Sequence, residues 1–226
     1  MRAIVRSLAV LLFLAGALSA CSTGSDAILD TALSMRRTSP DTAKLNPRYR
    51  YLRVQLGGNV ALLVLGYIEP HPQGPIDVWY SAEREVLKLQ NGRLVGAIGL
   101  LTEWRRVTLP ALPDWGTLIA SSEPLHWTRR RDVMPGYRYG VEDHLTLERI
   151  APVANSRLVG VDPASLTWFE ERDTPSAGEA ALPTVRYALD LRATGDPVVY
   201  GEACLTKDLC FAWQRWPVAQ TAAGAR

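Results

Sequence analysis

The sequence predicts an all-β domain, an antiparallel meander that forms a sandwich or an open barrel. Three observations predict this class. Many short segments alternate between apolar and polar residues with the period of a strand. Gly, Pro and Asn separate these segments at positions typical of turns. Apart from one stretch near the N-terminus, no segment combines helical periodicity with the length of a helix.

In the first half of the domain, turn residues mark the strand ends. Gly57-Gly58-Asn59 forms a turn because these residues tolerate positive φ. Residues 60–68 are almost wholly apolar, which indicates a strand covered on both faces. Asn91-Gly92 is the strongest hairpin signal in the chain, since a type I′ turn needs positive φ at both central positions. The strands predicted here are 48–56, 60–68, 76–80, 85–90 and 93–100.

In the second half, Pro110, Pro113 and Gly116 interrupt the chain before a further series of strands. Residues 194–197 supply a turn, and the last predicted hairpin follows it. Sequential hairpins of this kind favour a meander over long crossovers. The strands predicted here are 127–133, 138–149, 166–171, 185–192, 198–204 and 211–216.

Pro135-Gly136 lies between two of these strands and predicts a hairpin turn. If these two residues form the centre of the turn, Arg129 lies opposite Glu142 and Trp127 lies opposite His144. A Pro-Gly turn matches the twist of a two-stranded ribbon poorly, so this register is the least constrained in the domain.

The N-terminus is typical of a secretory signal. Arg2 and Arg6 precede an apolar run at residues 8–18, which is too short for an ordinary membrane-spanning helix. Leu18-Ser19-Ala20-Cys21 resembles the bacterial lipobox. The resemblance implies cleavage before Cys21, a diacylglyceryl thioether on its sulfur and acylation of the new amine. The alternative is a plain secretory signal with an incidental cysteine.

These features divide the chain into four parts. Residues 1–20 are the predicted lipoprotein signal peptide, and residues 21–47 are a tether in which 27–36 could form a short helix. Residues 48–218 are the all-β periplasmic domain, and 219–226 are a frayed tail. By resemblance to enterobacterial sorting rules, Ser22 after the cysteine favours the periplasmic face of the outer membrane, where two or three acyl chains anchor a protein stably.

Charge argues against a nucleic-acid partner. Without Arg2 and Arg6, the 25 basic residues fall to 23, equal to the 23 acidic residues. A nucleic-acid-binding protein would carry a clustered excess of Lys and Arg. The chain is instead rich in Trp and Tyr, with 7 and 8 residues against 3 Phe. Such side chains suit sheets that face water or a ligand.

Cys204 and Cys210 remain once Cys21 is assigned to the lipid. An even pair in an oxidising compartment predicts a disulfide. It would clamp the last hairpin and stabilise the domain by about 2 kcal/mol in the chain-entropy model. The rival interpretation is a metal site, but no His or third thiol lies nearby at a zinc-binding spacing.

The candidate ligand-binding residues are Trp79, Trp127, Arg129 and Arg131. Strand alternation sends Arg129 and Arg131 to one face, where guanidiniums beside Trp127 could grip the carboxylates or phosphates of an acidic polysaccharide. The alternative is ion pairing across the hairpin with Glu142 and Asp143. Trp79 could stack on a sugar if it points outward, with core packing as the alternative.

We find no convincing catalytic, cofactor-binding or metal-binding constellation. The sequence lacks the G-x-S-x-G and H-E-x-x-H motifs. Its three histidines are His71, His126 and His144. His144 with Glu142 and Glu148 could supply acid–base groups or metal ligands, but a solvated strand face is the better interpretation.

The assembled residues resemble the YjbF/GfcB family of bacterial lipoproteins, which is linked to group 4 capsule and exopolysaccharide operons. The resemblance runs from about Arg48 to Trp216. Its most specific part is Leu89-Gln90-Asn91-Gly92-Arg93-Leu94-Val95 with Gly99-Leu100. Further matches are Trp127-Thr128-Arg129, Arg186-Tyr187 and Gly195. The cysteine pair has no match in the family.

This resemblance implies an all-β periplasmic domain and an accessory, non-enzymatic role in capsule or exopolysaccharide production or export. The expected partners are the membrane, through the lipid anchor, an acidic polysaccharide, and outer-membrane or periplasmic export proteins. Two alternatives stay open. One is a polysaccharide-modifying enzyme that uses His144, and the other is a scaffold that docks an export protein through a sheet edge.

Overall fold

The computed structural model describes residues 42–175, 180–193 and 195–218. Contacts divide the chain between Lys44 and Leu45, and the strands described below all belong to the second unit, Leu45–Arg226. The predicted signal peptide, Cys21, most of the tether with its candidate helix, and the predicted tail lie outside the described residues.

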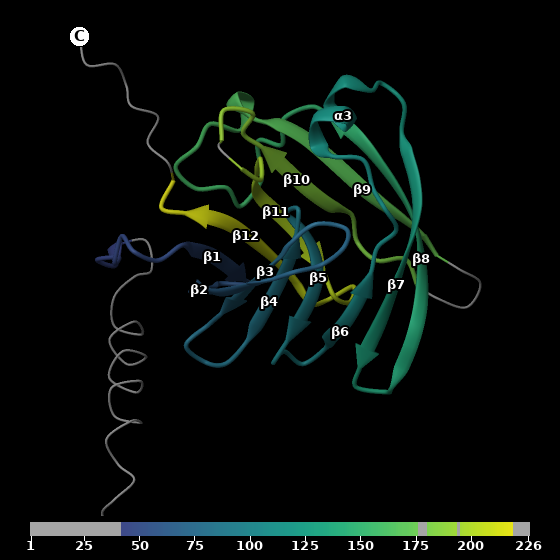
Figure 1. Cartoon of the computed structure of the whole chain (residues 1–226), viewed down its shortest axis with the longest axis horizontal. Helices are drawn as coiled ribbons and strands as arrows, with labels where there is room; N and C mark the ends of the chain where they lie inside the picture. The colour runs from purple at the N-terminus through teal and green to yellow at the C-terminus, as the bar shows by residue number, and fades with distance from the viewer. Residues whose placement is uncertain (1–41, 176–179, 194, 219–226) are drawn as a thin grey trace, which may run out of the picture. The chain divides into compact units, whose positions relative to one another are not determined.

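The described residues of this unit form a closed antiparallel barrel (Figure 1). Each strand pairs with its neighbours in sequence, and β1 pairs with β12 over six residues to close the ring. The strands are β1 (Tyr51–Leu56), β2 (Asn59–Glu69), β3 (Ile76–Tyr80), β4 (Val86–Gln90), β5 (Arg93–Ile98), β6 (Glu103–Thr108), β7 (Leu125–Met134), β8 (Arg138–Ile150), β9 (Thr167–Pro175), β10 (Val185–Leu189), β11 (Val198–Cys204) and β12 (Cys210–Trp216).

The all-β class and the meander are confirmed, and the barrel is closed rather than open. The sequence did not predict β6, because a bulge between Trp104 and Arg106 breaks its alternation. It also did not predict α3 (Trp115–Ala120), which is too short to show helical periodicity. Asp114 caps α3 by accepting a hydrogen bond from the Thr117 amide at 2.9 Å. A 3₁₀ turn, η3 (Pro163–Ser165), precedes β9.

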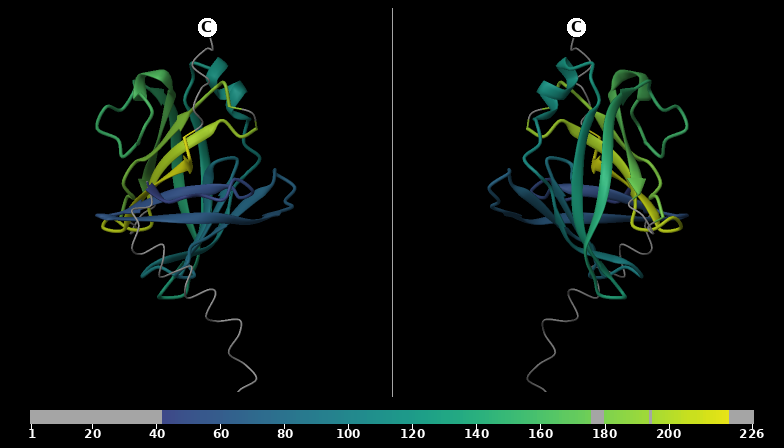
Figure 2. Two further views of the ribbon diagram at one scale, coloured as in Figure 1. Left: turned by 90° about the vertical axis from the view of Figure 1, so that its left-hand side faces the viewer. Right: turned by 90° about the vertical axis from the view of Figure 1, so that its right-hand side faces the viewer.

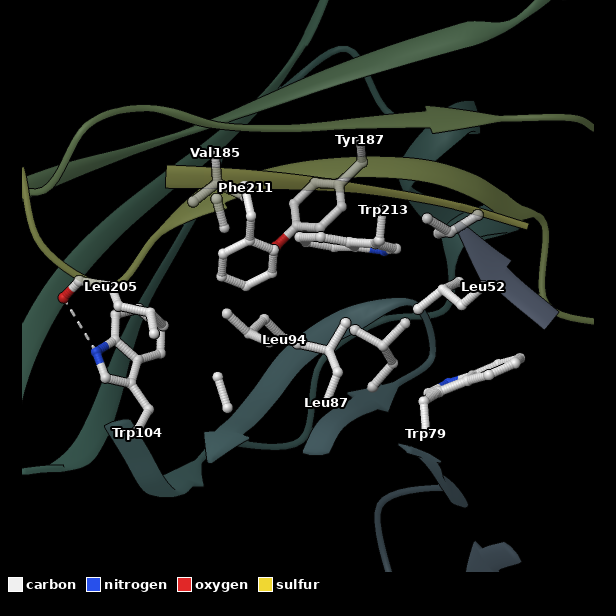
Figure 3. Packing of buried hydrophobic residues seen from close by; sticks show 14 of the residues in the cluster. Leu52, Trp79, Leu87, Leu94, Trp104, Val185, Tyr187, Leu205, Phe211 and Trp213 are labelled. Carbon is white, nitrogen blue, oxygen red and sulfur yellow. Dashed lines mark hydrogen bonds between the residues drawn. The ribbon is translucent and has the colours of Figure 1, made fainter. Parts of the chain in front are cut away.

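The barrel interior is a packed core and not an open channel. Its largest side chains are aromatic and come from strands all around the ring (Figure 3). Trp79, Trp104 and Trp213 are each at most 2% exposed. The Trp104 indole Nε1 donates to the Leu205 carbonyl at 3.3 Å, so this buried polar atom is satisfied.

Two segments outside the strands extend this core. The chain between β8 and β9 packs on the outer face of β9 to β12, where Trp168 and Tyr200 form a second cluster with Leu166. The side chain of Gln214 in β12 forms two hydrogen bonds with the backbone of Val159. These bonds hold the segment between β8 and β9 against the barrel. α3 lies at the end of the barrel opposite the β7–β8 turn (Figure 2). Its Trp115 packs on Phe169 and Tyr187 of the interior, and so closes that end.

The last hairpin carries the predicted disulfide. Cys204 ends β11, Cys210 begins β12, and the two residues lie directly opposite each other in the register. Their sulfurs are bonded, so the disulfide is confirmed.

Candidate functional site

The candidate site is a cluster of charged side chains inside the barrel. β7 alternates as predicted, with Arg129 and Arg131 buried and the side chain of Arg130 66% exposed between them. The guanidiniums that the sequence singled out therefore lie within the ring, at 3% and 5% exposure, instead of on an outer face.

Asp143 of β8 holds both of these arginines. Its Oδ2 accepts from the Nε of Arg129 at 2.8 Å and from the Nε of Arg131 at 2.7 Å. Its Oδ1 accepts from the Nη2 of Arg131 at 2.7 Å, which makes that pair bidentate. Arg129 also donates from Nη1 to Oε1 of Glu171 in β9 at 3.3 Å. One carboxylate thus joins two arginines, and Arg129 extends the network to a third strand.

Trp104 of β6 covers the network on one side. The guanidinium carbons of Arg129 and Arg131 lie 4.7 Å and 5.0 Å from the centre of its ring. At this distance the ring attracts both cations, and the attraction is strongest where water is excluded. The indole is fully buried, so it stabilises charges that have lost their hydration.

Arg93 of β5 is a further buried cation, and it lies under α3. Its guanidinium carbon lies 3.9 Å from the centre of the Trp115 ring, and the residue is 3% exposed. Its Nε and Nη2 have no hydrogen-bond partner among the described residues. Burial lowers the pKa of Arg93, although Tyr187, Glu171 and Asp196 oppose the shift.

The pKa values of the acidic groups in the cluster are shifted in opposite directions. Burial by itself would raise the pKa of Asp143, but the hydrogen bond from Arg131 and the charges of Arg129 and Arg131 bring it below its ordinary value. Burial raises the pKa of Glu171 and of Asp173. Glu171 Oε2 and Asp173 Oδ1 have no hydrogen-bond partner among the described residues.

This arrangement engages the arginines with carboxylates of the barrel itself. The ion-pairing alternative is what the structure shows: Arg129 and Arg131 bind Asp143, and on the outside Arg130 binds Glu142 with Nε 2.7 Å from Oε1. A polymer on the outer surface would not meet these two buried guanidiniums. These ion pairs connect β7 to β8 and β9 inside the barrel.

The register predicted for the β7–β8 hairpin is wrong by one residue. Arg129 lies opposite Asp143, not Glu142, and Trp127 lies opposite Leu145, not His144. Next to the turn, Val133 does pair with Arg138, as a turn centred on Pro135-Gly136 requires. The register then shifts at a bulge, where Gly140 adopts φ +64°. The extra residue in β8 turns Asp143 toward the interior arginines.

The two candidate tryptophans differ in exposure: Trp79 is buried, whereas Trp127 is partly exposed. Trp79 is 1% exposed in the core, so the outward orientation that sugar stacking required is not found (Figure 3). Trp127 is partly buried and packs against the cluster that contains Ile76, Val78 and Leu109. Trp127 also lines an open groove with His126 and His144.

The histidines lie apart from the charged cluster. His126 and His144 are exposed on the outer face, where each ring Nδ1 contacts a threonine, at 3.0 Å and 3.3 Å. Together with Thr174 they line an open groove of about 310 Å³. Glu142 and Glu148, the carboxylates considered with His144, pair with Arg130 and Arg172.

His71 lies in the β2–β3 loop, where its Nδ1 is 2.9 Å from the Gln90 amide. Within the described ranges, no group of three or more His, Cys, Asp or Glu side chains could hold a metal ion.

Sequence reasoning missed Glu171, Trp104 and Arg93 as members of the cluster. The alternation of β9 contains a usable signal, because Phe169 and Glu171 share the inward face while Trp168 and Glu170 belong to the other. The local sequence does not identify the partner of Glu171, because Arg129 is 42 residues away in the chain.

The fold and its interior define a class: a closed, up-and-down antiparallel barrel with a packed, internally paired core. The chain belongs to the YjbF family, described as "Group 4 capsule polysaccharide lipoprotein gfcB, YjbF", whose model matches residues 31–171.

Among solved structures, the chain is similar to the hypothetical lipoprotein YmcC from Escherichia coli (K12), with a TM-score of 0.63 and 18% identity. The similarity covers 84% of this chain and 95% of that one, and at this identity it shows the fold. No curated protein matches the chain. No helix in the described part of the chain is both long and apolar enough to cross a membrane.

Proposed function

We propose that this protein is an outer-membrane lipoprotein, facing the periplasm, with an accessory and non-enzymatic role in the production or export of capsule or exopolysaccharide. The observation that carries the proposal is the family match, which runs from before β1 into β9 and so includes Arg129, Arg131, Asp143 and Glu171. The lipobox-like Leu18-Ser19-Ala20-Cys21 supports anchoring through Cys21.

The interior chemistry supports a binding or assembly role over catalysis. Asp143 forms ion pairs with both central arginines, Glu171 also contacts Arg129, and Trp104 lies over both guanidiniums. A general acid or base must reach the proton that it transfers, whereas these groups are enclosed. The acidic polysaccharide and the export proteins therefore remain proposed partners of the outer surface.

A gene deletion tests the role. We expect less surface polysaccharide in the deletion strain, restored by the wild-type gene and restored poorly by Cys21→Ala, which keeps the barrel and loses the anchor. Normal polymer in the deletion strain would contradict the proposal. Labelling with a clickable fatty acid, followed by separation of the two membranes, tests the anchor and its location directly.

A second measurement tests the non-enzymatic part. The purified mature protein is incubated with polysaccharide from the producing strain, and the size and composition of the polymer are then compared with an untreated sample. We expect no change in either. Shortened or chemically altered polymer would overturn this part of the proposal and leave the anchoring intact.

A further inference from the structure

Two exposed tyrosines lie side by side on the outer face of β2 and β3, and neither belongs to the packed core. Tyr67 is 47% exposed and Tyr80 is 40% exposed. Their ring centres lie 6.4 Å apart and the ring planes meet at 39°. Tyr80 follows the buried Trp79 directly, so the alternation of β3 turns one aromatic inward and the next outward.

Gly66 makes room for the ring of Tyr80 to lie against the strand. A Cβ at Gly66 would be 2.6 Å from two ring carbons of Tyr80, closer than real contacts allow. The register between β2 and β3 shifts at this position, between Leu65 and Tyr67. One face of the Tyr80 ring is thus covered by the backbone, and the exposed part is its other face and edge.

A pair of opposite charges borders the rings. Lys88 of β4 donates from Nζ to Oε2 of Glu69 at 2.8 Å, and both side chains are partly exposed, at 25% and 39%. Lys88 lies opposite Val78, which in turn lies opposite Tyr67. Partial burial and the neighbouring Tyr67 raise the pKa of Tyr80, so its hydroxyl stays protonated and can donate. We call Tyr67, Glu69, Tyr80 and Lys88 the tyrosine platform.

The chemistry of this platform matches a pyranose ring. Such a ring has an apolar C–H face and a rim of hydroxyls, each of which both donates and accepts hydrogen bonds. The platform offers two aromatic rings for the apolar face, and an ammonium, a carboxylate and phenol hydroxyls for the rim. Because the charges of Lys88 and Glu69 cancel, the platform suits an uncharged sugar residue better than a carboxylate or phosphate.

We propose that the tyrosine platform is a saccharide-binding site on the outside of the barrel, and that it takes pyranose rings of the polysaccharide that the protein serves. This inference rests on the proposed function and names the surface through which the protein meets the polymer. Tyr80 supplies the stacking surface, and Gly66 positions it.

Affinity electrophoresis of the full mature protein tests the site, with polysaccharide purified from the producing strain in the gel. We expect the polymer to retard the wild-type protein. Tyr80→Ala should weaken the apparent affinity about tenfold, in the range expected when an aromatic contact is removed. Tyr80→Phe keeps the ring and should retain most of the binding.

Gly66→Ala is the sharper variant, because it leaves Tyr80 in the chain and pushes its ring off the strand. We expect the same loss of retardation as for Tyr80→Ala. Tyr139→Ala is the matched control, since Tyr139 is 66% exposed on β8 and lies outside the platform. Urea unfolding shows whether each variant folds; if Gly66→Ala does not, Tyr80→Ala alone decides the test.

Three results would overturn the inference: no retardation of the wild-type protein, wild-type retardation of Tyr80→Ala, or an equal loss in Tyr139→Ala. The deletion strain separates this outcome from the proposed function. If deletion lowers surface polymer while Tyr80→Ala restores it fully and binds normally, the platform is wrong and the function stands. If the platform binds polymer while deletion changes nothing, the function is wrong and the binding site stands.

Discussion

Asp143 is the residue on which the charged interior depends. It satisfies Arg129 and Arg131 together and is 2% exposed, so water cannot replace it. Glu142, its neighbour in sequence, points outward and pairs with the exposed Arg130. The same strand therefore carries a buried ion pair and a surface ion pair one residue apart. Removing one partner of the buried pair should cost much more stability than removing one partner of the surface pair.

Asp143→Asn should lower the free energy of unfolding by about 3–5 kcal/mol, because it leaves buried guanidiniums without their counter-charge. Glu142→Gln, the control on the outer face, should change it by about 1 kcal/mol or less. Urea denaturation of both variants beside the wild type measures the difference. Equal effects of the two substitutions would show that burial does not govern these pairs.

Glu171 should give the domain a pH dependence of opposite sign to that of Asp143. Because burial raises its pKa above the ordinary 4.5, its favourable contribution exists below that value and is lost as pH rises through the raised pKa. Glu171→Gln removes this loss, so the variant should gain stability relative to the wild type as pH rises from 4 to 8.

Asp143 supplies the comparison. Its pKa is lowered, so its contribution exists above the ordinary 3.8 and is lost as pH falls through the lowered value. The deficit of Asp143→Asn should therefore shrink in acid. Unfolding midpoints measured between pH 3 and pH 8 test both trends, and a flat profile for Glu171→Gln against the wild type would contradict the first.

At the scale of elements, local features of the hairpins and of α3 decide which side chains reach the interior. The bulge at Gly140 decides which residues of β8 face the interior, and the cap at Asp114 sets the start of α3, which brings Trp115 over Arg93. The β11–β12 hairpin is further constrained by a disulfide between Cys204 and Cys210, which are six residues apart in the sequence. Such a short loop limits the entropy that the bond removes from the unfolded chain.

Replacing both Cys204 and Cys210 with Ala should lower the free energy of unfolding by about 2 kcal/mol in the chain-entropy model. Reducing the wild-type protein should produce a similar shift, and the double variant should not respond to the reductant. Urea unfolding with and without dithiothreitol checks both expectations. A wild-type midpoint unchanged by reduction would show that the bond adds no stability.

At the scale of the whole molecule, closure is the defining property. β12 pairs with both β11 and β1, and it places Phe211 and Trp213 in the interior. Every described strand has two neighbours, although β5 and β6 pair at a single position, Ala97 with Trp104. The ring and its core should therefore unfold together.

A chain that ends at Asp208 lacks β12 and should lose cooperative unfolding and aggregate, since β1 and β11 become unpaired edges. A chain that ends at Val218 keeps all the described strands and should behave like the full-length protein. Size-exclusion chromatography and circular dichroism during urea unfolding compare the two. A soluble monomer with a sharp transition from the shorter chain would contradict the role of closure.

By itself, the sequence determined the described strands other than β6, and its successive turns favoured a meander. Alternation placed Arg129 and Arg131 on one face, and the cysteine pair indicated its disulfide, because these features depend on residues close together in the chain. The tertiary structure decided closure, the register beyond the Gly140 bulge, and the partners of the buried arginines. Those depend on twist accumulated over the whole ring and on contacts such as Arg129 with Glu171, which no local pattern encodes.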